Sequence, residues 1–162
     1  MDETWCSLNT ELAMRFWTKE DERMYALVNN TLQEGLAQGE DLRRLAGRLC
    51  SAVGNSHQEA YRIAENVIGA VMSESRYESC RRAGMTHKKW ICPRAPMREL
   101  GGHRDAERKY SRQPCPINEP FLVNGVPLRF PRDYTSGHPE ECVGCQCLMI
   151  GKRAWTDLAP PA

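Results

Sequence analysis

The hydrophobic pattern in the first half of the chain has the period of α-helices. Apolar residues recur every three or four positions between Met24 and Leu36, and Gly35 and Gly39 bracket the expected end of this segment. One apolar stripe at this spacing predicts an amphipathic helix. The next segment, 40–49, has acidic residues in its first turn and three leucines on one side, which predicts a short second helix.

The stretch from Ser56 to Gly84 predicts one long helix. Ser56 and Glu59 are spaced as a capping box, in which the hydroxyl and the carboxylate bind free amides at a helix start. Arg81 and Arg82 fall in the last turn, and Gly84 suits the left-handed stop position. Apolar side chains share a face between these ends: Ala60, Ile63, Ala64, Val67, Ile68, Val71 and Met72.

After Gly84 the helical period is lost. Residues 86–92, THKKWIC, have the composition of a short strand. Five prolines then follow between residues 92 and 120, and this spacing excludes long regular elements apart from a short helix around 103–109. Loops therefore dominate the middle of the second half.

Two later segments predict strands again. Asn124 and Gly125 stand between two apolar runs, and this pair predicts a two-residue hairpin turn because both residues tolerate a positive φ. Pro127 has no amide hydrogen, so its strand is expected to pair on one side only at that point. Residues 146–152 form the final predicted strand.

These patterns together predict an α+β protein. An N-terminal helical part with one long helix, 1–84, precedes a small, loop-rich antiparallel β lobe, 85–150, which holds the hairpin and the C-x-C segment. A tail, 151–162, follows. We expect these parts to form one structural unit.

The composition is that of a globular protein, and it says little about which class of partner the protein binds. The 162 residues are 41% hydrophobic and 27% charged, and the formal net charge is +1, so bulk electrostatics demand neither nucleic acid nor a membrane as partner. No apolar run approaches the roughly 18 residues of a membrane-spanning helix. The acidic start of the chain does not have the pattern of a secretory signal, so we expect a cytosolic chain with reduced thiols.

The cysteines are of two kinds according to where they lie in the sequence. Cys6, Cys50 and Cys80 lie in helical sequence, where a free cysteine usually serves as a small core residue. The other five follow Trp90: Cys92, Cys115, Cys142, Cys145 and Cys147. Candidate chemistry therefore concentrates in the β lobe.

The segment HPEECVGCQC, 138–147, is the strongest candidate for a metal site. Zinc requires four sulfur or nitrogen ligands, and a loop-rich lobe gains stability from an ion that joins its segments. We predict His103, Cys142, Cys145 and Cys147 as zinc ligands, with Cys92, Cys115 and His138 as other donors that spacing alone does not separate. In the alternative interpretation, Cys145 and Cys147 point to one face of a strand and simply pack.

Other chemistries have weaker signals. No nucleophile signature surrounds a cysteine, so an enzyme is not expected, although a cysteine hydrolase is a third hypothesis. Gly101 and Gly102 precede a predicted helix, but no lysine-bearing phosphate loop follows. Basic residues near Trp90 and Trp155 suit nucleic-acid contact, although a tryptophan in a small sheet is more often part of the core.

Several short motifs follow one another along the chain. They are RIAEN at 62–66, RRAG at 81–84, HKKW ending at Trp90, a loop with Arg94 and Arg98 that leads to His103, EPFLVNG at 119–125, PRD at 131–133 and CQC at 145–147. With this order, the segment from about Leu27 to Leu148 resembles the phage Mu F-like head morphogenesis family, the minor capsid proteins of tailed phages and prophages.

The chain departs from that family's pattern at three places. The Thr-Glu pair usual in the long helix is Glu65-Asn66 here, the Asp-Gly after the family's histidine is absent after His103, and Gln146 replaces the arginine of the family's C-R-C. The resemblance implies that the histidine and the paired cysteines form a metal or structural cluster, which here means His103, Cys145 and Cys147.

The resemblance also implies a function. It predicts a non-enzymatic minor head protein that acts at the portal or the capsid interior during procapsid assembly. The implied partners are the portal protein, the major capsid or scaffold protein and packaged DNA, and no membrane. The implied location is the virion, and the host cytoplasm during assembly. Because the chain ends soon after the C-x-C, no fused toxin is expected. The alternative function is a zinc-stabilised nucleic-acid-binding module.

Overall fold

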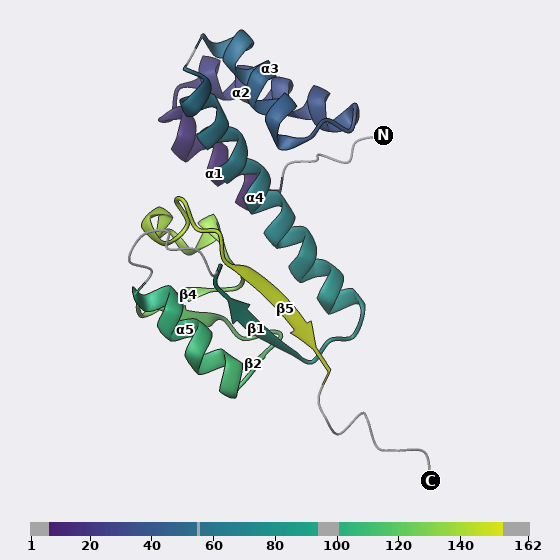
Figure 1. Ribbon diagram of the computed structural model, residues 1–162, viewed down its shortest axis with the longest axis vertical. Coiled ribbons are helices and arrows are strands. Elements are labelled where there is room, and N and C mark those ends of the chain that lie inside the picture. The colour runs from purple at the N-terminus through teal and green to yellow at the C-terminus, as the bar shows by residue number, and fades with distance from the viewer. Residues whose placement is uncertain (1–6, 55, 94–100, 154–162) are drawn as a thin grey trace. The chain divides into compact units, whose positions relative to one another are not determined.

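The computed structural model describes residues 7–54, 56–93 and 101–153. These residues form helices and small antiparallel sheets, with a helical part followed by a β region, so the predicted α+β class is confirmed. The chain divides into two compact units, unit 1 (1–71) and unit 2 (72–162). The division falls inside the long helix α4, His57–Arg82, which Figure 1 shows as one continuous ribbon.

Unit 1 is built from helices alone within its described residues. They are α1 (Leu8–Thr18), α2 (Glu22–Ala37), α3 (Leu42–Val53) and the first part of α4. Side-chain oxygens of Ser7, Asp21 and Asp41 accept hydrogen bonds from amides of the first turns of α1, α2 and α3. Such N-caps satisfy amides that the helix itself leaves free, so the sequence sets these helix starts locally.

The core of unit 1 is aliphatic. Its buried members are Met14, Val28, Leu32, Leu45, Ala46, Leu49, Ala60, Ile63, Ala64 and Val67. Helix α2 ends at Ala37, between Gly35 and Gly39, as the sequence predicted. Gly35 itself lies within α2, where a β-carbon would collide with the Leu45 side chain of α3. The missing side chain therefore lets α2 and α3 approach closely, while Gly39, with φ of +70°, follows the helix end.

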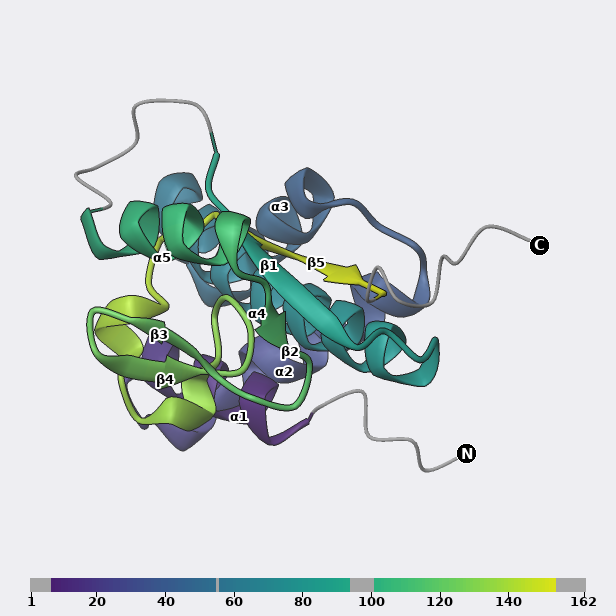
Figure 2. The ribbon, with the colours of Figure 1, turned by 90° about the horizontal axis from the view of Figure 1, so that it is seen from below.

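Unit 2 has a three-stranded antiparallel sheet in the order β2-β1-β5. Its strands are β1 (His87–Ile91), β2 (Cys115–Pro116) and β5 (Leu148–Lys152). The hairpin of β3 (Phe121–Val123) and β4 (Val126–Leu128) forms a second sheet, and α5 (Gly101–Arg112) lies beside β1 (Figures 1 and 2). Short 3₁₀ helices, η1 (Tyr134–Ser136) and η2 (Pro139–Glu141), lie before β5.

The core of unit 2 is aromatic and rich in sulfur. Its large members are Tyr77, Trp90, Tyr110, Phe121, Phe130 and Met149, joined by Cys92, Cys115, Cys145 and Cys147. Trp90 is fully buried and contacts the rings of Phe121 and His103 edge-on. The burial of Trp90 confirms the core interpretation and removes this side chain as a nucleic-acid contact.

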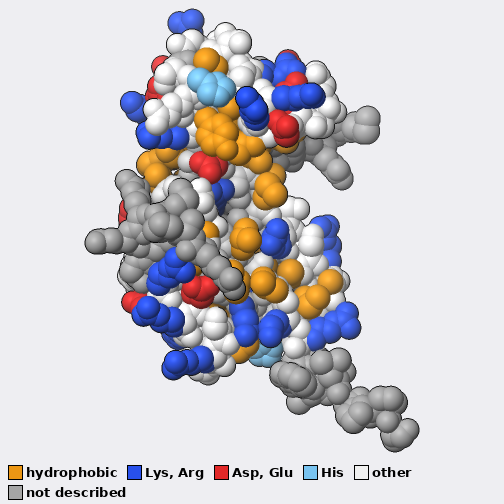
Figure 3. Space-filling model, viewed as in Figure 1, with side chains coloured by type: hydrophobic (Ala, Val, Ile, Leu, Met, Phe, Trp, Pro, Cys, Tyr) orange, Lys and Arg blue, Asp and Glu red, His pale blue; other side chains and the backbone are white. Residues whose placement is uncertain are grey.

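The outer face of the sheet carries apolar side chains. Along β5, Met149 is buried, whereas Leu148 and Ile150 on either side are each about half exposed. Figure 3 shows hydrophobic side chains gathered on the face of unit 2 that carries β5 in Figure 1, with Lys and Arg side chains around them. The alternation is that of a strand with one buried face.

Most predicted elements of the β region are present. The strand at 86–92, the short helix near 103–109 and the final strand correspond to β1, α5 and β5. Asn124 and Gly125 join β3 to β4 with φ of 51° and 80°, as their turn type requires. Cys6, Arg94, Arg98, Trp155 and residues 154–162 of the tail lie outside the described residues.

The predicted boundary at Gly84 marks the end of α4 but not the division between the compact units. Tyr77 belongs to the core of unit 2, and Cys80 packs against it. The last turns of α4 therefore belong with the β elements, and the division falls after Val71.

Candidate metal centre

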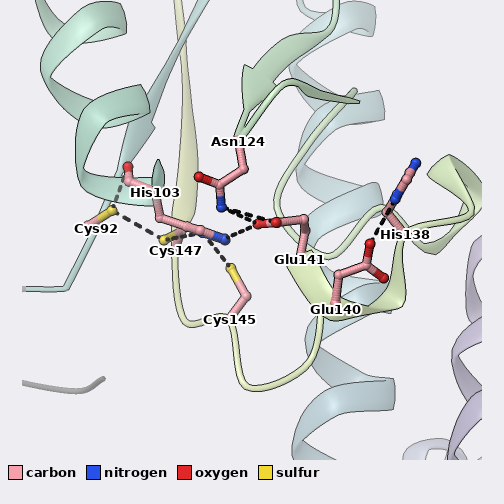
Figure 4. A network of polar contacts seen from close by, with 8 residues as sticks. All are labelled: Cys92, His103, Asn124, His138, Glu140, Glu141, Cys145 and Cys147. Carbon is pink, nitrogen blue, oxygen red and sulfur yellow. Dashed lines mark hydrogen bonds and ion pairs between the residues drawn. The ribbon is translucent and has the colours of Figure 1, made fainter. Parts of the chain in front are cut away.

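Three side chains far apart in the sequence form one buried cluster in unit 2. The Nδ1 atom of His103 lies 3.7 Å from Sγ of Cys145 and 3.6 Å from Sγ of Cys147. The donor atoms of all three lie within 4.8 Å of one another, and each residue is buried. Figure 4 shows the imidazole directed between the two sulfur atoms.

The fold brings these donors together from different elements. His103 is in the first turn of α5, whereas Cys145 and Cys147 belong to the extended segment that leads into β5. Gly144, with φ of 67°, closes the preceding turn, in which the amide of Cys145 binds the carbonyl of Cys142. The buried guanidinium of Arg132 donates from Nε to the Cys145 carbonyl, which fixes the backbone next to the thiol.

A second set of polar groups orients the histidine. Nε2 of His103 lies 2.9 Å from a Glu141 carboxylate oxygen, and Asn124 donates its side-chain amide to the same carboxylate at 3.0 and 3.1 Å (Figure 4). A β-carbon on Gly102 would collide with the Asn124 side chain. The absence of a side chain at Gly102 therefore leaves room for Asn124, and Asn124 fixes the Glu141 carboxylate. Glu141 in turn holds the imidazole with Nδ1 toward the thiols.

The charges in the cluster favour a thiolate at Cys145. The hydrogen bond from Cys147 lowers the pKa of Cys145 well below its ordinary value despite burial, and His103 lowers it further. Contact with Cys145 raises the pKa of Cys147. Burial by itself lowers the pKa of His103, but contacts with Cys145 and Glu141 outweigh burial and raise this pKa.

This geometry fits a tetrahedral zinc ion. With Zn–S of about 2.3 Å and Zn–N of about 2.0 Å, a sulfur and a nitrogen ligand lie roughly 3.6 Å apart. The two N–S distances here are 3.6 and 3.7 Å. A carboxylate on the far nitrogen of a ligating histidine is also the usual arrangement in zinc sites, because it sets the tautomer and the ring orientation. The cluster can therefore hold a metal ion.

Of the four predicted ligands, the structure brings together His103, Cys145 and Cys147. Cys142 is buried but lies outside this donor set, and its prediction as a ligand is not supported. Its amide follows η2 and binds the carbonyl of Pro139, and burial raises the pKa of its thiol. Cys142 and Cys145 lie at the two ends of the turn that Gly144 closes, yet only Cys145 contributes its thiol to the donor set.

Two of the other candidate ligands, Cys115 and His138, have partners outside the cluster. The thiol of Cys115 lies 3.5 Å from the carbonyls of Glu119 and Pro120, and His138 pairs with Glu140 at the surface. Cys92 is different, because its Sγ lies 3.3 Å from Sγ of Cys147. The sequence placed Cys92 at a strand end but held no signal for its partner, since that depends on which strand pairs with which.

A comparison of the chain with family models, with curated proteins and with solved structures finds no match. Among the described residues, no helix combines the length and the apolar character needed to cross a membrane.

Proposed function

We propose that this chain is a minor head protein of the head morphogenesis type, a structural component whose unit 2 is stabilised by a zinc ion. One observation carries the proposal. His103 and the two cysteines, the residues that the resemblance implies as a cluster, lie 42 and 44 positions apart in the sequence, yet their donor atoms meet at zinc-ligand spacing.

A structural role fits the burial of the cluster better than catalysis does. Cys145, His103 and Glu141 follow the order of a nucleophile, a base and an orienting carboxylate. However, Cys145 is only 2% exposed, and a second thiol lies as close to the imidazole as the first. A substrate needs access to its nucleophile, whereas a structural ion needs enclosure.

The outer face of β5 supports a role in assembly. Leu148 and Ile150 lie on one face of the strand and expose apolar surface, which on a soluble chain commonly marks a contact with another protein. We propose that this face contacts the portal, major capsid or scaffold protein in the assembling particle. The location that follows is the virion, and the host cytoplasm before assembly.

Co-purification tests the assembly role. The chain, produced together with the portal and capsid proteins of its own genome, is expected to appear in procapsids, and Leu148→Asp is expected to reduce its incorporation at least tenfold. Leu122→Asp, at an equally exposed apolar position on the hairpin strand β3, is the matched control. Absence of the wild-type chain from both procapsids and virions would refute the proposal.

Metal analysis tests the zinc separately. Protein purified without chelators is expected to carry about one zinc per chain. His103→Ala and Cys145→Ala are expected to abolish this content, whereas Cys142→Ala keeps it. Equal zinc loss in all three variants would contradict the ligand assignment. The nucleic-acid alternative predicts DNA binding that weakens as salt rises.

A further inference from the structure

A zinc ion held by His103, Cys145 and Cys147 would have three protein ligands. Structural zinc sites have four, because a closed tetrahedron excludes water and satisfies the ion within the fold. A three-ligand site instead leaves a position for water or substrate, and such sites are typically catalytic. The identity of the fourth group therefore decides what kind of site this is.

Cys92 is placed to be that group. In the antiparallel register, Ile91 of β1 pairs with Leu148 of β5, so the next residue of β1 faces the residue before β5. Those residues are Cys92 and Cys147, whose Sγ atoms lie 3.3 Å apart. The Cys92 thiol is 4% exposed and also lies 3.2 Å from the carbonyl of His103. It thus contacts two of the three ligand residues (Figure 4).

The surroundings of Cys92 hold its backbone in place. Its amide donates to a Glu107 carboxylate oxygen on α5 at 3.0 Å. The Cys92 sulfur lies 3.3 Å from that of Cys147, but more than 4.8 Å from at least one of the other two donor atoms. Because two sulfur ligands of a tetrahedral zinc lie roughly 3.8 Å apart, ligation requires the Cys92 side chain to rotate away from the His103 carbonyl and toward the other donors.

We propose that Cys92 is the fourth ligand and that the site is a closed structural zinc centre of three cysteines and one histidine. The inference rests on the zinc site of the proposed function and adds its coordination class. The ion then joins the end of β1, the first turn of α5 and the segment before β5. Three segments distant in sequence are tied at one point, which suits a lobe with short strands.

Cobalt substitution tests the assignment on the full chain. Co(II) occupies tetrahedral zinc sites, and its thiolate charge-transfer absorption near the ultraviolet grows with the number of sulfur ligands. The wild type is expected to show the intensity of three thiolates, and Cys92→Ala about one third less. Zinc affinity, measured by competition with a chromophoric chelator, is expected to fall at least tenfold in Cys92→Ala.

Two further variants control for folding. Cys142→Ala removes a buried thiol from the neighbouring turn and is expected to leave the spectrum and the affinity unchanged. Cys92→His keeps a donor at the same position and is expected to retain tight metal binding with the weaker, two-thiolate absorption. That combination identifies ligation and is not produced by loss of structure.

The outcomes separate the two proposals. Absence of cobalt and zinc binding in the wild type would refute the metal site itself, and with it this inference. Metal binding with unchanged absorption and affinity in both Cys92→Ala and Cys92→His would overturn only the fourth ligand. A disulfide between Cys92 and Cys147 in metal-loaded protein, detected by mass spectrometry, would also overturn it.

Discussion

The two units bury different kinds of side chain. Unit 1 has an aliphatic core taken from helix faces, and its buried polar residues are uncharged: Asn9, Thr10, Thr18, Thr31 and Asn66. Unit 2 has an aromatic and sulfur core, and it buries groups that carry charge or bind metals: Lys88, His103, Arg132 and Asp133. Buried charge is costly unless it is paired, so unit 2 requires particular partners where unit 1 requires mainly apolar volume.

The buried charges of unit 2 have such partners. Lys88 donates from Nζ to the carbonyl of Arg129 at 2.7 Å, and its ammonium lies over the rings of Tyr77 and Phe121. Asp133 accepts hydrogen bonds from the amide and the guanidinium of Arg129. Lys88 thus depends on a partner 41 positions away, whereas Asp133 is paired locally. The cluster of His103, Cys145 and Cys147 depends, like Lys88, on residues distant in sequence.

Removal of the metal should produce the largest difference in stability between the two units. Structural zinc contributes on the order of 10 kcal/mol to small metal-binding folds, so excess chelator is expected to abolish amide protection in β1, β3 and β5. Amides of α3 in unit 1 should keep their protection, because the two cores share no residue. Hydrogen exchange read by mass spectrometry measures both at once. Equal loss in both units, or none in either, would show that the comparison is wrong.

A cavity in unit 1 should give the reverse pattern. Leu49 is fully buried in α3, and Leu49→Ala is expected to cost about 3 kcal/mol, through lost burial and the cavity that remains. Protection of α2 and α3 amides should fall about a hundredfold, while the zinc content stays at wild-type level. Cys50→Ala, at the half-buried neighbouring position, is the matched control.

The buried lysine should make the stability of unit 2 rise with pH in the alkaline range. Burial lowers the pKa of Lys88 from its ordinary value of 10.5 to about 8. Between these values the unfolded chain holds a proton that the folded chain has released, so Lys88 makes stability rise with pH. From pH 8 to 10 the wild type should gain about 2 kcal/mol relative to Lys88→Met.

Urea unfolding followed by near-ultraviolet circular dichroism, which reports the aromatic core of unit 2, checks this difference. Burial raises the pKa of the Cys115 thiol and the Lys88 ammonium opposes this rise, so the comparison is made with Cys115→Ala in both proteins, which leaves the lysine as the group that differs. Parallel pH profiles for the two proteins would exclude a depressed Lys88 pKa.

The smallest effect should come from Gly102. In Gly102→Ala the new β-carbon displaces Asn124 and weakens the support of Glu141 for His103, so zinc affinity is expected to fall about tenfold. Helix propensity acts in the opposite direction, since alanine stabilises α5. Gly47→Ala in α3, where a β-carbon meets nothing within 4 Å, should leave the affinity unchanged. Chelator competition measures both.

The sequence by itself determined what depends on near neighbours. The period of apolar residues, the capping pair at Ser56 and Glu59 and the turn at Asn124-Gly125 act over a few positions, and the structure contains the helices and the hairpin that they predict. For the same reason the α+β class was readable from the residue pattern, and the helical unit was the easier to predict.

Only the tertiary structure decided which donors meet. Cys142 has metal-ligand spacing in the sequence but lies outside the donor set, while Cys92 has no such spacing and lies beside Cys147. The pairing of β1 with β5 and the approach of α5 to the hairpin set these positions. The contacts of His103 with Cys145 and of Cys92 with Cys147 join residues 40 or more positions apart. The local sequence pattern carries no information about them, because the chain can close such long loops in many ways and the packing of the whole core selects one.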